Sequence, residues 1–285
     1  IPGRYAGLLM MLPMLLPAGR GAHSTESQID FLDVGQGLAV LVSSRDYLMV
    51  YDTGPGNGRD AEAGWDLVAG TLLPMIKATG KKPDLVVVSH ADLDHAGGLK
   101  SLQAAFPKTD FLASLPRNEE GVRVCATPAV WAVGELTFSV LHPSAGLPYL
   151  GNDSSCVISV KGPGLSFLLS GDISRVVEQR LVSNGLEHHD VMSAPHHGSL
   201  TSSSQALIDA VMPHTVLISA GTNNRFGFPR EEVMRRYADA SIVALNTAQC
   251  GGLRITTGKN GYTRIESART SRQALWRWPA AAGCP

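Results

Sequence analysis

The amino-acid sequence predicts a layered α/β sandwich in which helices lie outside two β-sheets. The order of the expected elements carries this prediction: strands, a helix, a strand, a helix, more strands, and then alternating helices and strands. The chain has 285 residues, of which 44% are apolar, enough to form a sizeable core. Its 30 glycines and 17 prolines indicate many tight turns, as in a loop-rich α/β fold.

Composition and charge exclude several classes of protein. Disorder requires few apolar residues and a high net charge, whereas this chain has a net charge of −1 from 24 basic and 25 acidic residues. A multi-span membrane protein is excluded for this stretch, because a single apolar run approaches that character. A general polyanion-binding surface is not expected, so contact with nucleic acid would need a local basic patch.

The four cysteines are widely spaced and form no C-x-x-C motif. This pattern argues against a structural zinc ribbon and against a small disulfide scaffold. Cys156 and Cys250 could pair if the domain is exported, although the sequence does not determine connectivity.

The first 27 residues differ from the rest. An apolar run at 5–16 is flanked by Arg4 and Arg20 and interrupted by Pro13. A helix of that length reaches roughly 18 Å, short of the roughly 30 Å hydrocarbon core of a bilayer. It could be a signal-peptide segment, a buried helix, or the end of a transmembrane helix followed by a linker. We favour the third interpretation.

The remaining sequence predicts one domain at 28–266 and a tail at 267–285 without assigned structure. Short apolar or alternating runs bounded by turn residues predict the strands. They lie at 28–34, 38–44, 47–53, 84–89, 155–160, 165–170, 191–195, 215–220 and 241–247, with a β-rich stretch up to 141 and a terminal hairpin at 253–266. Helices are expected at 65–79, after 89 and up to about 106, and at 175–184, 204–211 and 230–238.

One motif carries candidate chemistry. The segment SHADLDHAGG at 89–98 follows the buried strand DLVVVS and places four side chains that can bind a metal within six residues: His90, Asp92, Asp94 and His95. Clustered imidazoles and carboxylates at the end of an apolar strand usually need a cation. A polar loop with a capping aspartate is the alternative, and ligand type and spacing favour metal binding.

These residues resemble the metal loop of the metallo-β-lactamase fold, whose usual form is H-x-H-x-D-H; here Asp92 replaces the second histidine. FLLSGDIS resembles the segment that supplies a carboxylate bridging two metals, which would be Asp172. SAPHHGS resembles the segment that supplies the last metal histidine, which would be His196 or His197. The resemblance implies a metallo-β-lactamase-like αββα four-layer sandwich.

Seven segments in order resemble one branch of that family more closely, the C-terminal domain of ComEC-type competence proteins, which are inner-membrane DNA-uptake channels. The resemblance spans 28–265 and rests on FLDVGQG, VYDTGPG, SHADLDHAGG, NDSSCV, LLSGDIS, PHHGSLTSS and NRFGFP. It implies that the apolar N-terminal run is the end of the last membrane helix of such a channel.

The chain departs from this branch at three places. Phe228 stands where the branch often has histidine, and Leu38 stands where it has an acidic residue. Asn152 and Asp153 occupy the region in which many relatives place a further metal histidine.

The resemblance implies two divalent ions. His90 and Asp92 would hold one ion, Asp94 and His95 with His196 or His197 would hold the other, and Asp172 would bridge both. Carboxylate in place of imidazole favours Mn²⁺ or Mg²⁺ more than an all-histidine site would, and we expect Mn²⁺ or Zn²⁺. Asp94 and Asp172 would be the catalytic carboxylates.

A pair of ions can lower the pKa of a bridging water and clamp the attacked phosphoryl group, which suits hydrolysis of phosphodiesters. The branch implies a DNA nuclease that degrades the strand that is not imported during transformation. The expected partners are single-stranded DNA, the membrane channel portion of the same chain and other competence proteins. The expected location is the inner membrane, with this domain on the extracytoplasmic side.

Substrate-binding candidates are weaker. Ser199 and Ser202 lie at an expected helix start that could hold a phosphate, and a plain N-cap is the equal alternative. Asn224 and Arg225 could contact a backbone phosphate, although a surface role is slightly favoured for Arg225. From residue 221 onward, ten basic and four acidic residues give a net charge of +6, which predicts either a basic face or a solvated arginine-rich surface.

Other polar residues are assigned structural roles. Asp33 and Asp52 are expected to order loops near the site. Four histidines lie outside every motif and are treated as structural: His142, His188, His189 and His214.

Two rival functions remain at this point. One is a metal hydrolase of another ester, such as a phosphorylcholine ester, lactone or β-lactam, because the fold hosts many chemistries. The other is a catalytically silent domain that guides DNA.

Overall fold

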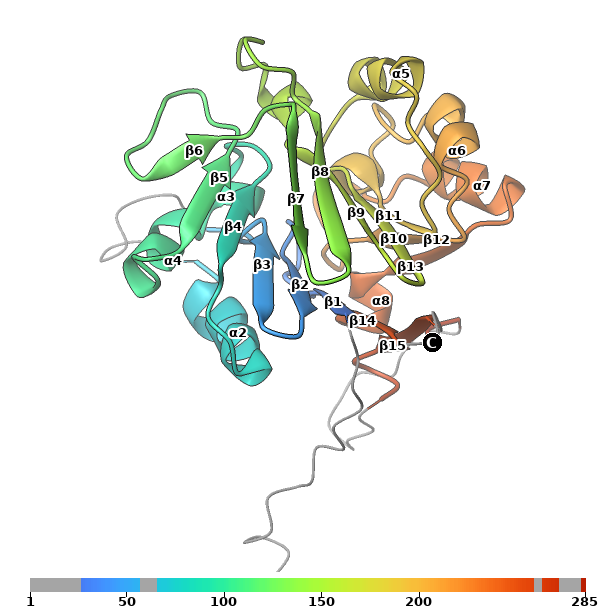
Figure 1. Ribbon diagram of the computed structural model, residues 1–285. Helices are drawn as coiled ribbons and strands as arrows, with labels where there is room; N and C mark the ends of the chain where they lie inside the picture. Colours follow the sequence, from blue (N-terminus) through green and yellow to red (C-terminus); the bar gives the residue numbers. More distant parts are fainter. Residues whose placement is uncertain (1–26, 57–65, 259–262, 272–282) are drawn as a thin grey trace, which may run out of the picture.

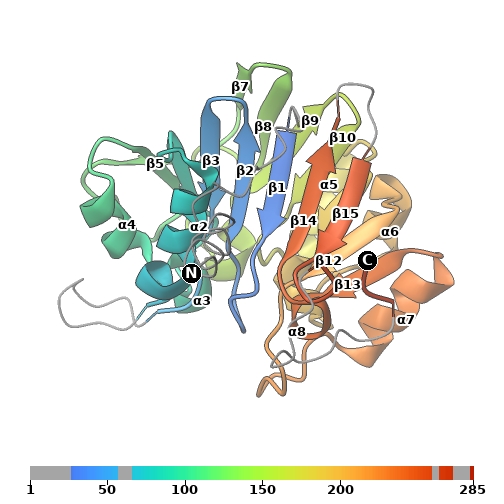
Figure 2. The same ribbon diagram turned by 90° about the horizontal axis from the view of Figure 1, so that it is seen from below.

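A computed structural model describes residues 27–56, 66–258, 263–271 and 283–285. Two β-sheets face each other, and helices cover the outer face of each sheet (Figure 1). The layer order is helix, sheet, sheet, helix, which confirms the predicted αββα sandwich. Figure 2 shows the same layers from below, with α2 and α4 on one side and α6 and α7 on the other.

The first sheet has the order β15-β14-β1-β2-β3-β4-β5-β6. Its strands are β1 (Ser27–Phe31), β2 (Val40–Ser44), β3 (Tyr47–Tyr51), β4 (Leu85–Val88), β5 (Asp110–Ala113), β6 (Val122–Val124), β14 (Leu253–Thr257) and β15 (Thr263–Ser267). The first three strands are antiparallel, as the hairpin-like spacing predicts, while β3 to β6 are parallel.

The second sheet has the order β13-β12-β11-β10-β9-β8-β7. Its strands are β7 (Ala129–Val133), β8 (Leu136–His142), β9 (Val157–Gly162), β10 (Leu165–Leu169), β11 (Val191–Ser193), β12 (Thr215–Ile218) and β13 (Val243–Asn246). Strands β10 to β13 are parallel, and β7 to β10 are antiparallel.

The helices are short, and several of them begin at a capping serine or end at a glycine. They are η1 (Val68–Leu72), α2 (Leu73–Thr79), α3 (Leu93–Ala96), α4 (Leu99–Ala105), η2 (Gly151–Ser154), α5 (Arg175–Ser183), η3 (Pro195–Gly198), α6 (Gln205–Val211), α7 (Glu231–Asp239) and α8 (Thr247–Cys250). Ser174 and Ser204 cap α5 and α6 through their hydroxyl oxygens. Gly80 ends α2 in the left-handed conformation, as the sequence predicts.

Three apolar layers hold the sandwich together. The layer between the sheets contains Phe31, Tyr51 and Phe138, and separate layers lie between each sheet and its helices. All five residues of β2 are buried because both faces of this strand are covered. The continuous apolar run LVVV forms β4, all of whose residues are buried, as expected for a parallel strand covered on both faces.

The parallel strands determine where the functional loops meet. Asp52 follows β3, Ser89 follows β4, and Asp172 follows β10. His197 and Ser219 follow β11 and β12. Because the carboxyl ends of parallel strands lie at one edge of a sheet, these loops gather at one end of the sandwich.

The cysteines pair differently from the one pairing considered on the sequence. Cys125 is bonded to Cys156 and Cys250 to Cys284, with Cα–Cα separations of 6.0 and 5.4 Å. The suggested bond between Cys156 and Cys250 is wrong, because Cys156 and Cys125 pack together at the β9 side of the core, whereas Cys250 ends α8. The second bond also fastens the last described residues, where the sequence predicts no structure.

The predicted transmembrane stub falls almost entirely on residues 1–26, which lie outside the described residues. In the described part of the chain, no helix has the length and apolar character needed to cross a bilayer.

Replacing both Cys125 and Cys156 by serine is expected to lower the free energy of unfolding by about 3–4 kcal/mol. The bond joins residues 31 apart, and opening a loop of that size restores this much chain entropy to the unfolded state. Urea denaturation measures the change. Thiol titration of the single variant Cys125→Ser checks the pairing: one free thiol is expected, and none would mean that Cys156 pairs elsewhere.

Candidate metal centre

Three loops bring imidazoles and carboxylates together at one end of the sandwich. Asp94 and His95 lie on α3, Asp172 follows β10, and His197 lies in η3. One group of ligand-type atoms within 4.8 Å comprises Asp94, His95 and His197, and a second comprises His90, His95 and Asp172. Most of these side chains are buried: His90 and His95 are fully inaccessible.

Asp172 is central to the cluster. Its Oδ1 lies 3.2 Å from His95 Nε2, and its Oδ2 lies 3.5 Å from His197 Nε2. The backbone N–H of Asp172 donates to Ser155 Oγ at 3.0 Å, which holds this turn against the segment that precedes β9 of the same sheet. Asp172 thus lies between His95 and His197, and its bridging of two ions stays a prediction.

Each buried histidine uses Nδ1 to contact the protein and turns Nε2 toward the cluster. His95 Nδ1 lies 2.8 Å from Asp52 Oδ2, and His197 Nδ1 donates to the Ser219 carbonyl at 2.8 Å. His90 Nδ1 lies 2.9 Å from Ser89 Oγ. This pattern leaves the Nε2 lone pairs for the centre, as in metal sites whose histidines are held by a second hydrogen bond.

Asp52 does more than order a turn. Its carboxylate accepts from the backbone N–H of Ser89 at 2.6 Å and from the Ser89 hydroxyl at 2.8 Å, in addition to its contact with His95. The residue is fully buried and has a left-handed backbone with φ of 58°. Strain at a non-glycine residue persists where its surroundings hold it, which is common at functional sites.

The ligand atoms are spaced as a metal would require. His95 Nε2 and His197 Nε2 are 3.1 Å apart, and His197 Nε2 is 3.3 Å from Asp94 Oδ2. Two ligands of a tetrahedral ion at bond lengths near 2.0–2.1 Å lie about 3.3 Å apart. His90 Nε2 is buried and has no hydrogen-bond partner within the described residues. An unpaired buried nitrogen beside carboxylates fits a cation as its missing partner.

The electrostatics also favour positive charge here. Burial raises the pKa of Asp172, but the facing imidazoles of His197 and His95 outweigh this effect and hold it well below its usual value. Burial likewise opposes the charged form of His95, yet Asp172 and Asp52 raise its pKa well above the ordinary value. Burial acts to raise the pKa of Asp94, but the facing imidazole of His197 outweighs burial, and the pKa is lowered to about 2. The cluster therefore attracts cationic charge.

The structure distinguishes the two neighbouring histidines. His197 is buried and points its Nε2 into the group with Asp94 and His95. His196 is partly exposed; its Nε2 lies 3.8 Å from Asp172 Oδ2 and 3.4 Å from Asn152 Nδ2. Both have positive φ, 49° and 55°, so this turn is strained in two consecutive residues.

Asp92 lies at the rim. Its side chain is 55% exposed, and its Oδ2 is 3.7 Å from His90 Nε2. The nearby His90 imidazole lowers the pKa of this carboxyl, so Asp92 is available as an anionic ligand from the solvent side.

Glycines allow the loops to approach closely. A Cβ on Gly37, whose φ is 131°, would lie 2.3 Å from the Asp94 carbonyl, and one on Gly97 would lie 2.1 Å from the Gly56 nitrogen. Leu38 N–H donates to the Asp94 carbonyl at 3.1 Å. The DVGQG and DTGPG segments thus press against the metal loop, which explains Gly37 and Gly56.

The predicted phosphate loop has another role. Ser202 is fully buried, and its hydroxyl donates to the Ile173 carbonyl at 2.8 Å. The N–H groups of Ser203 and Ser204 donate to the buried carboxylate of Glu178 at 2.6 and 2.8 Å. Ser199 is also buried and lies 3.0 Å from the Thr201 hydroxyl. An internal carboxylate thus occupies the place at the helix start that an external phosphate would take.

The two substrate-binding candidates on the 221–228 loop differ: one is bonded within the loop and the other is exposed. Asn224 holds the loop: its Nδ2 donates to the Gly221 and Phe228 carbonyls, and its Oδ1 accepts from the Phe228 N–H. Arg225 is exposed, and its guanidinium carbon lies 4.7 Å from the centre of the Phe226 ring.

Two aromatic rings, those of Phe226 and Phe228, stand beside the centre. The Phe228 ring lies 5.6 Å from that of His196 and 6.3 Å from that of His197. Phe226 stacks on Phe228 at 5.4 Å and is 39% exposed. We call Phe226 and Phe228 the aromatic wall. Sequence reasoning noted Phe228 as a departure and did not single out Phe226.

Among the described residues after 221, the basic side chains do not gather on one free face. Four of the arginines pair with carboxylates: Arg235 with Glu231, Arg254 with Asp30, Arg264 with Glu266, and Arg269 with Asp33. Arg225 and Arg230 instead lie over the aromatic wall.

Comparison with known proteins identifies the family. A family model described as the metallo-beta-lactamase superfamily matches residues 32–221. The chain belongs to the metallo-β-lactamase superfamily. The diiron beta-hydroxylase CmlA from Streptomyces venezuelae has the same fold, with a TM-score of 0.51 and 14% identity over 82% of this chain and 54% of CmlA.

Curated relatives support the branch that the seven motifs indicate. Recombination protein 2 of Haemophilus influenzae is 33% identical over 85% of this chain and 30% of its own length. Competence protein ComA of Neisseria gonorrhoeae is 32% identical over 90% and 38%, and ComE operon protein 3 of Bacillus subtilis is 32% identical over 80% and 33%. The resemblance is confirmed, and the chain spans about a third of the length of the curated relatives it matches.

Replacing Asp52 by asparagine is expected to weaken metal binding about 10- to 100-fold, because His95 loses the carboxylate that orients it. Competition with a chromophoric chelator measures the affinity for Mn²⁺ or Zn²⁺. Asp33→Asn removes the same charge from a nearby exposed loop and should leave the affinity unchanged. Equal affinities for wild type and Asp52→Asn would contradict the positioning role of Asp52.

Proposed function

We propose that this chain is a two-metal phosphodiesterase domain that hydrolyses DNA as part of a DNA-uptake protein. One observation carries the proposal: a buried centre of carboxylates and imidazoles lies directly against a partly exposed aromatic wall with arginines over it. The centre suits ester hydrolysis, and the wall suits a chain of bases and phosphates. The competence name of one relative agrees with this substrate.

The two groups of ligand-type atoms, and the 3.7 Å between His90 Nε2 and Asp92 Oδ2, support the following proposed ligands. Asp94, His95 and His197 would hold one ion, His90 and Asp92 the other, and Asp172 would contact both. Two divalent ions in this position, Mn²⁺ or Zn²⁺, would lower the pKa of a water molecule and neutralise the charge on the attacked phosphate.

The protein's own residues would orient the substrate. Arg225 is exposed and could neutralise a backbone phosphate, while Phe226 offers a face for stacking of a base. A hollow of about 380 Å³, lined in part by Asn223 and Phe228, adjoins this wall and offers room for part of a bound strand. His196 faces solvent next to Asp172, where it could exchange a proton with the leaving oxygen.

We further propose that the domain lies on the extracytoplasmic side of the inner membrane, next to the channel portion of a longer chain, and degrades the strand that is not imported. Two disulfides and no free cysteine support an oxidising compartment.

Mn²⁺-loaded protein is expected to cleave labelled single-stranded DNA, and EDTA should stop the reaction. Asp172→Asn should reduce the rate by at least about a hundredfold, since loss of a shared ligand costs at least as much as loss of an outer partner. Asp110→Asn, an exposed carboxylate paired with Arg123, is the matched control and should keep full activity.

Other outcomes would favour the rival functions. DNA binding without cleavage at saturating Mn²⁺ would favour a silent guide. Turnover of a lactone, β-lactam or phosphorylcholine ester with intact DNA would favour another hydrolase.

Phe226→Ala is expected to raise KM for single-stranded DNA about five- to a hundredfold with little change in kcat, because stacking contributes about 1–3 kcal/mol per base. Hydrolysis of bis(p-nitrophenyl) phosphate, which is too small to span the wall and the centre, should be unaffected. Phe226→Trp should restore a low KM. An unchanged KM for DNA in Phe226→Ala would remove the wall from substrate binding.

A further inference from the structure

Besides the two groups of the candidate centre, a third group of ligand-type side chains lies far from it. His188, Asp190 and His214 present ligand atoms that all lie within 4.8 Å of one another. Asp190 immediately precedes β11 and His214 immediately precedes β12, whereas His197 and Ser219 follow those strands. The cluster therefore occupies the amino-terminal edge of these parallel strands, opposite the centre described above.

The sheet register creates this proximity. Val191 of β11 pairs with Thr215 of β12, so the residues just before them are also neighbours. The His214 N–H donates to the Asp190 carbonyl at 2.9 Å, which fixes both backbones. Because 24 residues of sequence separate the two strands' first residues, no local motif could reveal the pair.

The distances match a metal site. His188 Nε2 lies 3.2 Å from Asp190 Oδ1, and His214 Nδ1 lies 3.5 Å from the same oxygen. Two ligands of a tetrahedral zinc ion lie about 3.3 Å apart. Carboxylate oxygen and imidazole nitrogen are both ordinary zinc ligands.

The hydrogen bonding of His188 selects the tautomer that a metal needs. Its Nδ1 donates to the Val211 carbonyl at 2.8 Å, so a metal at Nε2 would take the place of a proton shared with Asp190 Oδ1, 3.2 Å away. The backbone N–H of His189 donates to the same carbonyl at 3.1 Å, which holds the loop in place. Histidine ligands of metals are commonly fixed in this way.

We propose that His188, Asp190 and His214 bind a zinc ion or a similar divalent transition-metal ion. Asp190 supplies one negative charge, and the side chain of His214 is 79% exposed, so water can complete the coordination. This site differs from the candidate centre in position and in all of its residues.

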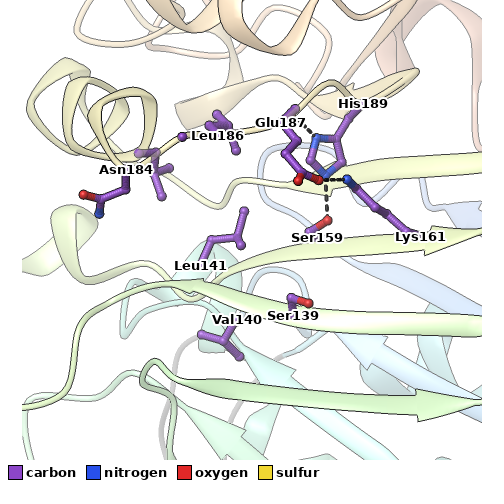
Figure 3. A pocket seen from close by; sticks show the side chains of 11 residues that line it. Ser139, Val140, Leu141, Ser159, Lys161, Asn184, Leu186, Glu187 and His189 are labelled. Carbon is purple, nitrogen blue, oxygen red and sulfur yellow. Dashed lines mark hydrogen bonds and ion pairs between the residues drawn. The ribbon is translucent and has the colours of Figure 1, made fainter.

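The ion would brace the segment between α5 and β11. Figure 3 shows the other side of that segment, where Leu186, Glu187 and His189 border a cavity of about 400 Å³ above β8 and β9. His189 Nε2 accepts from the Ser159 hydroxyl at 2.6 Å, and Glu187 pairs with Lys161. A metal at His188 and Asp190 would tie the same segment to the start of β12.

Equilibrium dialysis of the chain with ZnCl₂ tests the proposal. Wild type should bind one zinc ion more than His214→Ala and one more than Asp190→Asn. Glu187→Gln removes an equal charge from the same segment outside the cluster and should bind as many ions as wild type. Because the result is a difference of one ion, it does not depend on how many ions the candidate centre holds.

A second measurement covers the case in which a variant is poorly folded. Nitrogen-15 spectra of the wild-type histidine rings should show His188 as the Nδ1–H tautomer, with its Nε2 signal shifted by zinc and restored by EDTA. Equal stoichiometry in wild type and both cluster variants, or a His188 signal that does not respond to zinc, would overturn the proposal.

Discussion

The candidate centre depends on the hydrogen bonds that hold Nδ1 of three buried histidines. Asp52 holds His95, the Ser219 carbonyl holds His197, and Ser89 lies against His90. Without these contacts the rings could rotate, and the Nε2 atoms would not face a common point. An orientation built into the fold reduces the entropy that a metal must overcome on binding.

The fold brings together residues that are far apart in the sequence to make these hydrogen bonds. Asp52 and His95 are 43 residues apart in the sequence, and His95 and His197 are 102 apart. They nevertheless lie together, because the parallel strands that precede them end at the same end of the sandwich. Closely packed glycines such as Gly37 bring the supporting loops within contact. The Cys125–Cys156 bond fastens the start of β9, next to Ser155, whose hydroxyl accepts from the Asp172 N–H.

Much of this fold can be predicted from local sequence. Apolar runs between turn residues locate β1, β2, β3 and β4 closely, because each run is short and clearly bounded. The pairing of β14 with β1 cannot be predicted in this way, since it joins residues more than 200 positions apart. The same limit explains the cysteine pairing, which depends on which side of the core each thiol faces.

The residues of the site also divide into those that can be predicted from the sequence and those that cannot. The metal loop can be recognised in the sequence because its four candidate ligands fall within six residues. The resemblance adds Asp172 and one of His196 and His197, and it does not say which of the two histidines is the ligand. The orienting role of Asp52 is not visible, because a carboxylate in a turn has many uses. Ser202 shows the opposite error: its hydroxyl is the type that binds phosphate, but the fold buries it against the Ile173 carbonyl. Whether such a hydroxyl binds a ligand depends on whether another group of the protein already bonds to it, and the sequence does not show which groups lie nearby.

The central claim is that this cluster of side chains is a binding site for two divalent ions. A crystal grown with Mn²⁺, with diffraction recorded on both sides of the manganese absorption edge, tests it most directly. We expect two anomalous peaks that both contact the carboxylate of Asp172, one of them also bound by Asp94, His95 and His197 Nε2. Absence of any peak at this position at saturating Mn²⁺ or Zn²⁺ would contradict the claim and leave only the shape of the fold in common with metal hydrolases.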